Sequence, residues 1–317
     1  FDRSARPSEV FRFVLCYIIG RQFVILHQIV VVEIMRKKKE KLNSEYIVSL
    51  YDVYLWDVIN DVKYNFHEDH FRIRDLETGH PVSHPLLNHF FATVFIHGDK
   101  AYAFSADYGY DRPWWTCQAI DVIVSDDLIS WSKPVPAIRA ENENLFNNAV
   151  TRASDHFYML YETDDRAYPK FTFKFAWSDD LLHWNKIPGA LYGTDKYVGG
   201  PSMYYIAPFF YVTYVNHNKD KNGRDFFDSR IVRSKDLITW EEPKGIRPVV
   251  YPDFTHVIDP ENHPDQFEIN ASDVEFEEKD GKVIAYWNGG NQWDLGDAQS
   301  AEYDGSLKQL FESFFEQ

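Results

Sequence analysis

The chain has 317 residues and 44% of them are hydrophobic, which is enough to bury a large core in one or two domains. Its formal net charge is -16, and an acidic chain repels phosphate backbones, so we expect no nucleic-acid partner. Aromatic residues make up 17% of the chain, a load that suits strands and sugar-facing surfaces better than a helical bundle. The two cysteines, Cys16 and Cys117, form no disulfide framework and have no metal-ligand spacing. This favours a reducing compartment, and we expect a cytoplasmic location.

The first 44 residues differ in character from the rest. Residues 11–34 are rich in apolar side chains but include Arg21 and Glu33, so the segment makes a poor membrane span and we expect no membrane partner. A basic cluster follows at residues 36–39 without a small-residue cleavage site, which argues against a secretory signal. We interpret Met35 as the natural start, with residues 1–34 as an upstream extension, and residues 1–44 as the N-terminal extension that precedes the domain. The alternative is an amphipathic helix packed on the domain.

A short motif, Ser-x-Asp-Leu-x-x-Trp, recurs along the remaining residues. Clear copies begin at Ser125, Ser178 and Ser234, and degenerate copies begin at Ile73 and Ala301. Successive copies are therefore 52, 53, 56 and 67 residues apart, which matches one four-stranded blade plus its loops. The sequence predicts an all-β, five-bladed β-propeller over residues 45–317.

The motif has a physical interpretation. Its Asp side chain can accept backbone N–H groups and close a tight turn, and its Leu and Trp then fall back onto the apolar layer between blades. We therefore interpret Trp131, Trp184 and Trp240 as packing residues. Hairpin patterns at 91–105, 149–161, 202–214 and 274–287 predict four blades. Residues 45–72 must supply the remaining blade, with 51–56 as its best inner strand, and residues 306–315 predict a short amphipathic helix.

The motif is typical of the five-bladed propeller glycoside hydrolases, and the chain resembles families 32, 43 and 117 from about residue 50 to its end. A poorly characterised bacterial subgroup is resembled more specifically by five stretches, at 147–150, 159–162, 270–274, 287–292 and 301–305. The resemblance implies three acidic residues at the mouth of the central funnel, where inner strands begin. Hydrolysis needs one carboxyl to protonate the leaving oxygen and a second to attack or to activate water.

Three acidic residues are the predicted catalytic set. Asp52 stands where the resemblance places the base, with Asp57 as its competitor. Glu162 ends an apolar strand, where a carboxylate is either paired or functional, and we predict that it is the general acid. Asp273 begins the last inner strand and is predicted to bind substrate or tune the acid, while Glu275 is expected to alternate outward.

The chain departs from families 32 and 43 at two of the predicted strand starts. Asn148 stands where an acidic residue is expected nearby, and Glu141 or Glu143 could substitute for it. Gly199-Gly200 stands where the general-acid motif is expected.

Sugar binding needs flat apolar faces together with a few polar groups. The predicted substrate-binding residues are His89, Trp114, Trp115, Asn148, Trp287, Asn291, Gln292 and Trp293. For each Trp the alternative is packing between blades, and for His89 it is a hydrogen-bonded structural role. No cofactor is expected. Some relatives hold a calcium ion in the propeller channel, but nothing in this sequence indicates one.

These observations predict a glycoside hydrolase acting on a plant or algal oligosaccharide. Two alternatives stay open at this point. A carbohydrate-binding propeller without catalysis would explain the departures at Asn148 and Gly200. A glycoside phosphorylase would need a cluster of Arg, Lys or His around phosphate, and the acidic balance argues against it.

Overall fold

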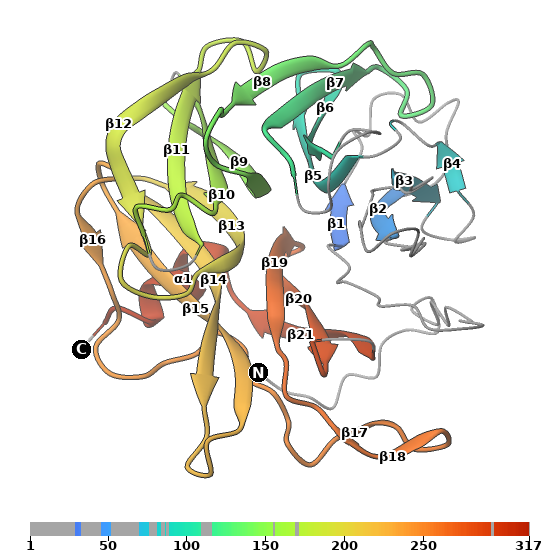
Figure 1. The fold of residues 1–317 in the computed structure, drawn as a ribbon, viewed down its shortest axis with the longest axis vertical. Helices are drawn as coiled ribbons and strands as arrows, with labels where there is room; N and C mark the ends of the chain where they lie inside the picture. Colours follow the sequence, from blue (N-terminus) through green and yellow to red (C-terminus); the bar gives the residue numbers. More distant parts are fainter. Residues whose placement is uncertain are drawn as a thin grey trace, which may run out of the picture. The chain divides into compact units, whose positions relative to one another are not determined.

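A computed structural model shows an all-β chain with one short helix (Figure 1). It describes residues 29–32, 46–51, 70–75, 81–83, 86, 89–108, 116–154, 156–168, 171–292 and 295–316. These residues fall into two compact units. The first holds residues up to 147 together with 181–183, and the second holds the remaining residues from 148 onward.

The first unit is built on one eight-stranded sheet. Its strands are β1 (Ile29–Val32), β2 (Tyr46–Tyr51), β3 (His70–Asp75), β4 (Pro81–Ser83), β5 (His89–His97), β6 (Lys100–Asp107), β7 (Ala119–Ser125) and β8 (Val135–Arg139). The strands β1 to β4 pair antiparallel in chain order, and so do β5 to β8. A single parallel pairing, between His70 and His89, joins the two sets. The inner strand expected at 51–56 lies outside the described residues, except for Tyr51 in β2.

Three antiparallel sheets carry the second unit, and the first of them begins in residues 145–147 of the other unit. They comprise β9 (Leu145–Ala153), β10 (His156–Thr163), β11 (Thr172–Ser178) and β12 (Asn185–Tyr192); β13 (Gly199–Ile206), β14 (Phe209–Lys219), β15 (Asp225–Ser234) and β16 (Trp240–Glu241); and β19 (Ser272–Lys279), β20 (Lys282–Gly290) and β21 (Gly296–Asp304). A small hairpin, β17 (Val257–Asp259) with β18 (His263–Phe267), precedes the last sheet. Each of these three sheets is a meander of consecutive strands, which is the build of a propeller blade.

The three clear copies of the motif form the turns that follow β7, β11 and β15. In one copy the Ser125 hydroxyl accepts the backbone N–H of Leu128 at 2.8 Å, and Asp127 Oδ1 accepts those of Ile129 at 2.8 Å and Ser130 at 2.7 Å. The Leu of all three clear copies has a positive φ, near 62° to 66°. Backbone N–H groups that donate to Asp236 lower the pKa of its carboxyl to about 2. The predicted turn role of the motif is confirmed.

Two of the motif tryptophans pack as predicted. The Trp240 ring stacks on Phe175 with centroids 5.5 Å apart, and its Nε1 donates to the backbone oxygen of Leu191 on β12, the neighbouring sheet, at 2.9 Å. In the first unit, Trp131 Nε1 donates to Ser83 Oγ on β4 at 3.3 Å. The Trp240 contact buries apolar surface between two consecutive sheets, and such burial is the main stabilising term for a fold of this kind.

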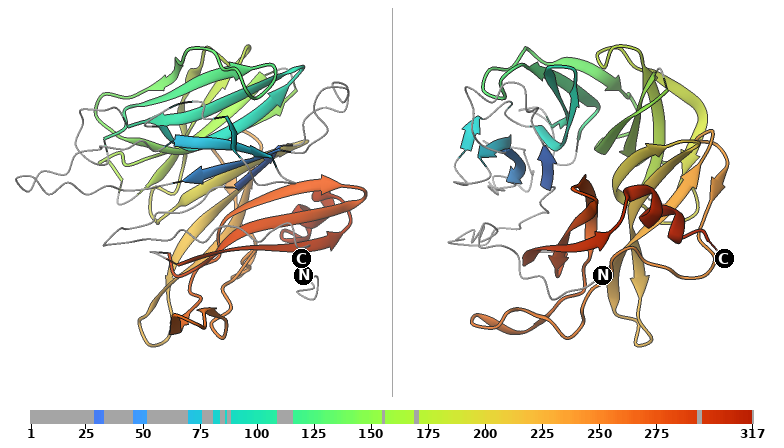
Figure 2. Two further views of the ribbon diagram at one scale, coloured as in Figure 1. Left: turned by 90° about the vertical axis from the view of Figure 1, so that its right-hand side faces the viewer. Right: turned by 180° about the vertical axis from the view of Figure 1, so that it is seen from behind.

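A short helix, α1 (Leu307–Ser313), ends the described chain and confirms the predicted C-terminal helix. Ser306 and Gln309 form a reciprocal capping box at its N-terminus. Its buried residues Leu310 and Phe311 pack against the β19–β21 sheet (Figure 2). No helix in the described part of the chain is long and apolar enough to cross a membrane.

Candidate active site

Four of the predicted site residues, Asp52, Trp114, Trp115 and Trp293, lie outside the described residues, as does Asp57. The other predicted residues are described and are taken in turn below. The two that come together are Glu162 and Asp273, both in the second unit.

Glu162 stands near the end of β10 and is only 4% exposed. The three preceding residues of β10 are also buried, so the strand itself carries this carboxylate into the interior. The backbone N–H of Gly200 donates to Glu162 Oε2 at 3.1 Å. A buried carboxylate needs such a donor, because an unpaired buried charge is costly.

Asp273 reaches the same glycine from the last sheet. A Cβ on Gly200 would overlap Asp273 Oδ1, so the carboxylate fills the space that a side chain would need. Both residues hold a left-handed backbone, with φ of 47° at Gly200 and 54° at Asp273. Burial raises the pKa of Asp273 to about 6, and a hydrogen bond from the Ser272 hydroxyl partly offsets the rise.

The two carboxylates are therefore held by one residue. Because each approaches Gly200 within a bond or contact length, their nearest oxygens lie no more than about 8 Å apart. Retaining glycosidases separate their carboxyls by about 5 Å and inverting ones by roughly 6.5–9.5 Å. Both figures refer to the separation of the acid from the base or nucleophile, and the predicted base, Asp52, lies outside the described residues.

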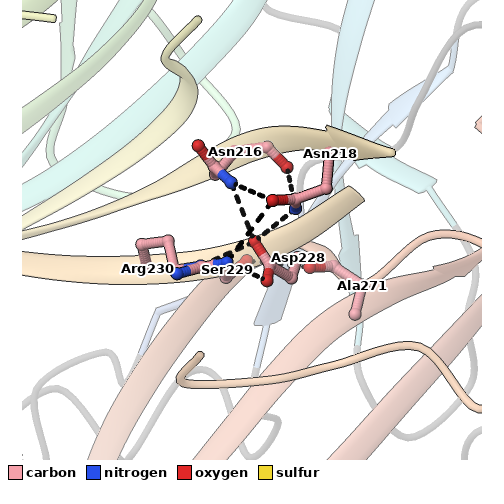
Figure 3. A network of polar contacts seen from close by, with 6 residues as sticks. All are labelled: Asn216, Asn218, Asp228, Ser229, Arg230 and Ala271. Atoms are coloured by element: carbon pink, nitrogen blue, oxygen red, sulfur yellow. Dashed lines mark hydrogen bonds and ion pairs between the residues drawn. The ribbon is translucent and has the colours of Figure 1, made fainter. Parts of the chain in front are cut away.

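A hydrogen-bonded chain fixes the segment that leads into Asp273. The side-chain amide of Asn270 donates to Ser272 Oγ at 2.9 Å and to the backbone oxygen of Asn288 at 2.8 Å. One residue further, Ser229 Oγ donates to the backbone oxygen of Ala271 at 2.9 Å (Figure 3). These bonds attach the start of β19 to β15 and β20, and so set the position of the Asp273 carboxylate.

A buried ionic network lies beside this attachment, on β14 and β15 (Figure 3). Asp228 is fully buried, and Arg230 holds it with two bonds, Nε to Oδ1 at 2.8 Å and Nη2 to Oδ2 at 2.6 Å. The amides of Asn216 and Asn218 also donate to Asp228 Oδ1, at 3.3 Å and 3.0 Å. Sequence reasoning missed this group, although alternating polar residues in two otherwise aromatic strands were a readable signal.

Tyr197 was also missed. Its hydroxyl lies 3.0 Å from the position that a Cβ on Gly199 would take. Burial raises the pKa of its phenol, and the nearby negative charges of Glu162 and Asp273 raise it further. The absence of side chains in the Gly199-Gly200 pair thus leaves room for two polar groups, Tyr197 and Asp273.

Glu275 corrects one expectation. Strand alternation predicted that it points outward, yet it is partly buried and accepts a hydrogen bond from the Tyr204 hydroxyl at 3.2 Å. Burial still alternates along β19, with Val274 buried and Glu275 partly buried, so Glu275 stays on its expected face and is covered there by Tyr204 of β13. Burial raises the pKa of Glu275 to about 8, and the charge of Asp273 adds to the rise.

Most of the remaining predicted residues are packed or bonded within the protein. His89 is 8% exposed and its Nε2 lies 3.2 Å from Asp121 Oδ2. This contact fits the alternative interpretation of His89 as a hydrogen-bonded structural residue. Asn148 is fully buried in β9, and Trp287 is 7% exposed within an apolar cluster. Asn291 Oδ1 accepts the backbone N–H of Leu295 at 3.1 Å, and Gln292 next to it has a φ of 69°. Among the residues that the structure describes, no group of His, Cys, Asp and Glu could hold a metal ion.

No protein-family model matches the chain, and no curated protein sequence matches it. Solved structures of low sequence identity do match. A glycosyl hydrolase from Bacteroides ovatus aligns with a TM-score of 0.52 and 12% identity, over 90% of this chain and 87% of its own. The Bacteroides ovatus xyloglucan PUL GH43B structure aligns with a TM-score of 0.53 and 14% identity, over 83% of this chain and 51% of its own. The Bombyx mori GH32 β-fructofuranosidase aligns with a TM-score of 0.55 and 10% identity, over 82% of this chain and 57% of its own.

This chain therefore spans about half the length of the last two structures. At such identities the likeness establishes a shared fold. The chain has the β-propeller fold seen in solved glycoside hydrolases of families 43 and 32. Four blades are found among the described residues, and the fifth predicted blade stays a prediction.

Proposed function

We propose that the chain is a glycoside hydrolase acting on a plant or algal oligosaccharide, with Glu162 as general acid, Asp273 as the residue that tunes it and Asp52 as base. One observation carries the proposal. Glu162 and Asp273 come from different sheets and approach the same glycine, on a fold shared with glycoside hydrolases.

The chemistry follows from the two carboxyls. In the first step the bond between the anomeric carbon and the leaving oxygen breaks while Glu162 gives its proton to that oxygen. Water supplies the hydroxyl that adds to the anomeric carbon, and the base takes the remaining proton of that water. A neighbouring carboxylate favours the protonated form of an acid, and Asp273 is that neighbour.

We also propose that β1–β4 form the fifth blade. The four strands pair antiparallel in chain order, and a degenerate motif copy overlaps the end of β3, the third strand. Asp52 itself lies outside the described residues, and its place in the acidic set rests on its position in the sequence.

The ion pairs of the second unit favour hydrolysis over phosphorolysis. Arg230 is held by Asp228 with two hydrogen bonds, and Lys196 pairs with Glu242 at 2.5 Å. A phosphate ligand would have to displace these carboxylates.

The test uses purified full-length protein and a panel of 4-nitrophenyl glycosides and plant and algal oligosaccharides. On the compound that the protein hydrolyses, E162Q is expected to lower kcat/KM by about 10²–10⁴ without loss of fold. D273N and D52N should lower it as well. The exposed ion-pair variant E302Q is the control and should keep full activity. Full turnover in E162Q would refute the assignment, and calorimetric glycan binding without any product would favour the non-catalytic alternative.

A further inference from the structure

A row of aromatic rings leads away from the two carboxylates. Tyr197 makes edge contacts with Phe171, His217 and Phe227, at centroid distances of 5.8 Å, 6.1 Å and 6.5 Å. His217 and Phe227 belong to the paired strands β14 and β15 and lie directly opposite each other. Because Tyr197 lies near Glu162 and Asp273, the row begins beside the proposed catalytic pair.

His217 is held in one orientation. Its ring stacks nearly parallel on Phe227, with centroids 4.9 Å apart and an angle of 16° between the planes. Its Nε2 lies 2.7 Å from Asp225 Oδ1. The side chain is nevertheless 35% exposed, whereas Phe227 beneath it is buried. The imidazole is therefore a fixed flat surface open to solvent, so a ligand meeting it need not order it at an entropic cost.

The Tyr197 hydroxyl is a polar group without an internal role. No described residue forms a hydrogen bond with it, and it rests against the backbone at Gly199. Because burial and the two carboxylates raise the pKa of this phenol, the hydroxyl stays protonated and can donate. Buried polar groups usually have a hydrogen-bond partner, so we expect a ligand to accept a hydrogen bond from this hydroxyl.

We propose that Tyr197, His217 and Phe227 form a subsite that binds a neutral sugar ring next to Glu162 and Asp273. The sugar lays one face on the His217 ring and receives a hydrogen bond from the Tyr197 hydroxyl. This inference rests on the proposed function and deepens it by naming the substrate class. The Asp273 carboxylate near Tyr197 opposes a uronate or a sulfated sugar, because like charges in a partly buried site repel each other.

The experiment compares H217A, H217F and Y197F with the wild type on the glycoside that the wild type turns over best. H217A should raise KM about tenfold, because it removes a flat contact surface, and should change kcat by less than about twofold. H217F keeps the flat ring and should recover most of the loss. Y197F should raise KM several-fold. Melting temperatures of all variants report whether each has folded.

The chain offers matched controls for both positions. His156 also pairs with a carboxylate, Asp179, at 2.7 Å and has a 36% exposed side chain, but it lies at the opposite end of β10 from Glu162. Tyr205 stands near the far end of β13 from Gly199. H156A and Y205F should therefore leave KM unchanged. Folded H217A and Y197F enzymes with wild-type KM would overturn the subsite.

The outcome is separable from that of the proposed function. If E162Q keeps its turnover, the acid assignment fails while the KM values still judge the subsite. If no glycoside is turned over, D-xylose, L-arabinose and D-glucuronate are titrated into wild type and H217A by protein-observed NMR. The subsite predicts binding of a neutral sugar that weakens about tenfold in H217A, and weaker binding of glucuronate. Equal affinities in the two proteins, no binding, or a preference for glucuronate would overturn it.

Discussion

A single methyl group at Gly200 should disturb the site more than any other substitution of that size. The Cβ of G200A would overlap Asp273 Oδ1 and lie 3.0 Å from Val215 Cγ2. The Asp273 carboxylate would have to move, and the Gly200 N–H that Glu162 accepts would move with the backbone. One substitution should thus displace both proposed catalytic carboxylates.

The magnitude can be worked from two contributions. An Ala at φ of 47° costs about 1–2 kcal/mol because its Cβ clashes with its own backbone. Forcing a neighbour to shift in a packed site costs about 1–3 kcal/mol more. Gly245 provides the control, since it has φ of 76° and a Cβ there would meet nothing within 4 Å. G245A should therefore cost only the first contribution, about 1–2 kcal/mol.

Urea unfolding of both variants measures the free energy of unfolding, and steady-state kinetics measures turnover. G200A is expected to lose about 2–5 kcal/mol, and its kcat/KM should fall at least about 100-fold, as for a reacting group misplaced by about 1 Å. G245A should retain wild-type kinetics. Equal free energies of unfolding and equal kinetics in the two variants would refute the view that Gly200 is the point on which the carboxylates converge.

Two further predictions concern buried charge. The pKa of Glu275 is about 8 in the folded protein and about 4.3 in the unfolded chain. Between these values the folded protein holds a proton that the unfolded chain has lost. The free energy of unfolding should therefore fall as pH rises from about 6 to 8, by at most about 1.4 kcal/mol per pH unit. E275Q should flatten this dependence in urea unfolding, and an unchanged slope would contradict the assignment. R230M leaves the buried Asp228 without its cation and should lower the free energy of unfolding by about 3–5 kcal/mol. The control K282M breaks an exposed pair with Glu302 and should lower it by less than about 1 kcal/mol. Similar losses in the two variants would show that Asp228 is not desolvated.

The sequence alone was sufficient for the blades, their turns and one carboxylate. The turn of each clear motif copy is made by contacts within a few residues, such as Ser125 to Leu128, so a local pattern encodes it. Glu162 was identifiable because a lone carboxylate at the end of an apolar strand is unusual. The packing role of Trp240 followed from its fixed place after the turn.

The tertiary structure decided what surrounds Glu162. Asp273 and Gly200 are 73 positions apart in the chain, and their approach depends on how two sheets pack, which no local pattern records. In the sequence, Gly199-Gly200 stands where a general-acid motif is expected and so suggested that the acid is missing. In the structure, the pair provides the space that Asp273 and Tyr197 occupy. Glu275 is covered by Tyr204, a contact between β19 and β13 that no local pattern records. The repeat thus specifies where blades begin and end, while long-range packing selects which polar groups share a site.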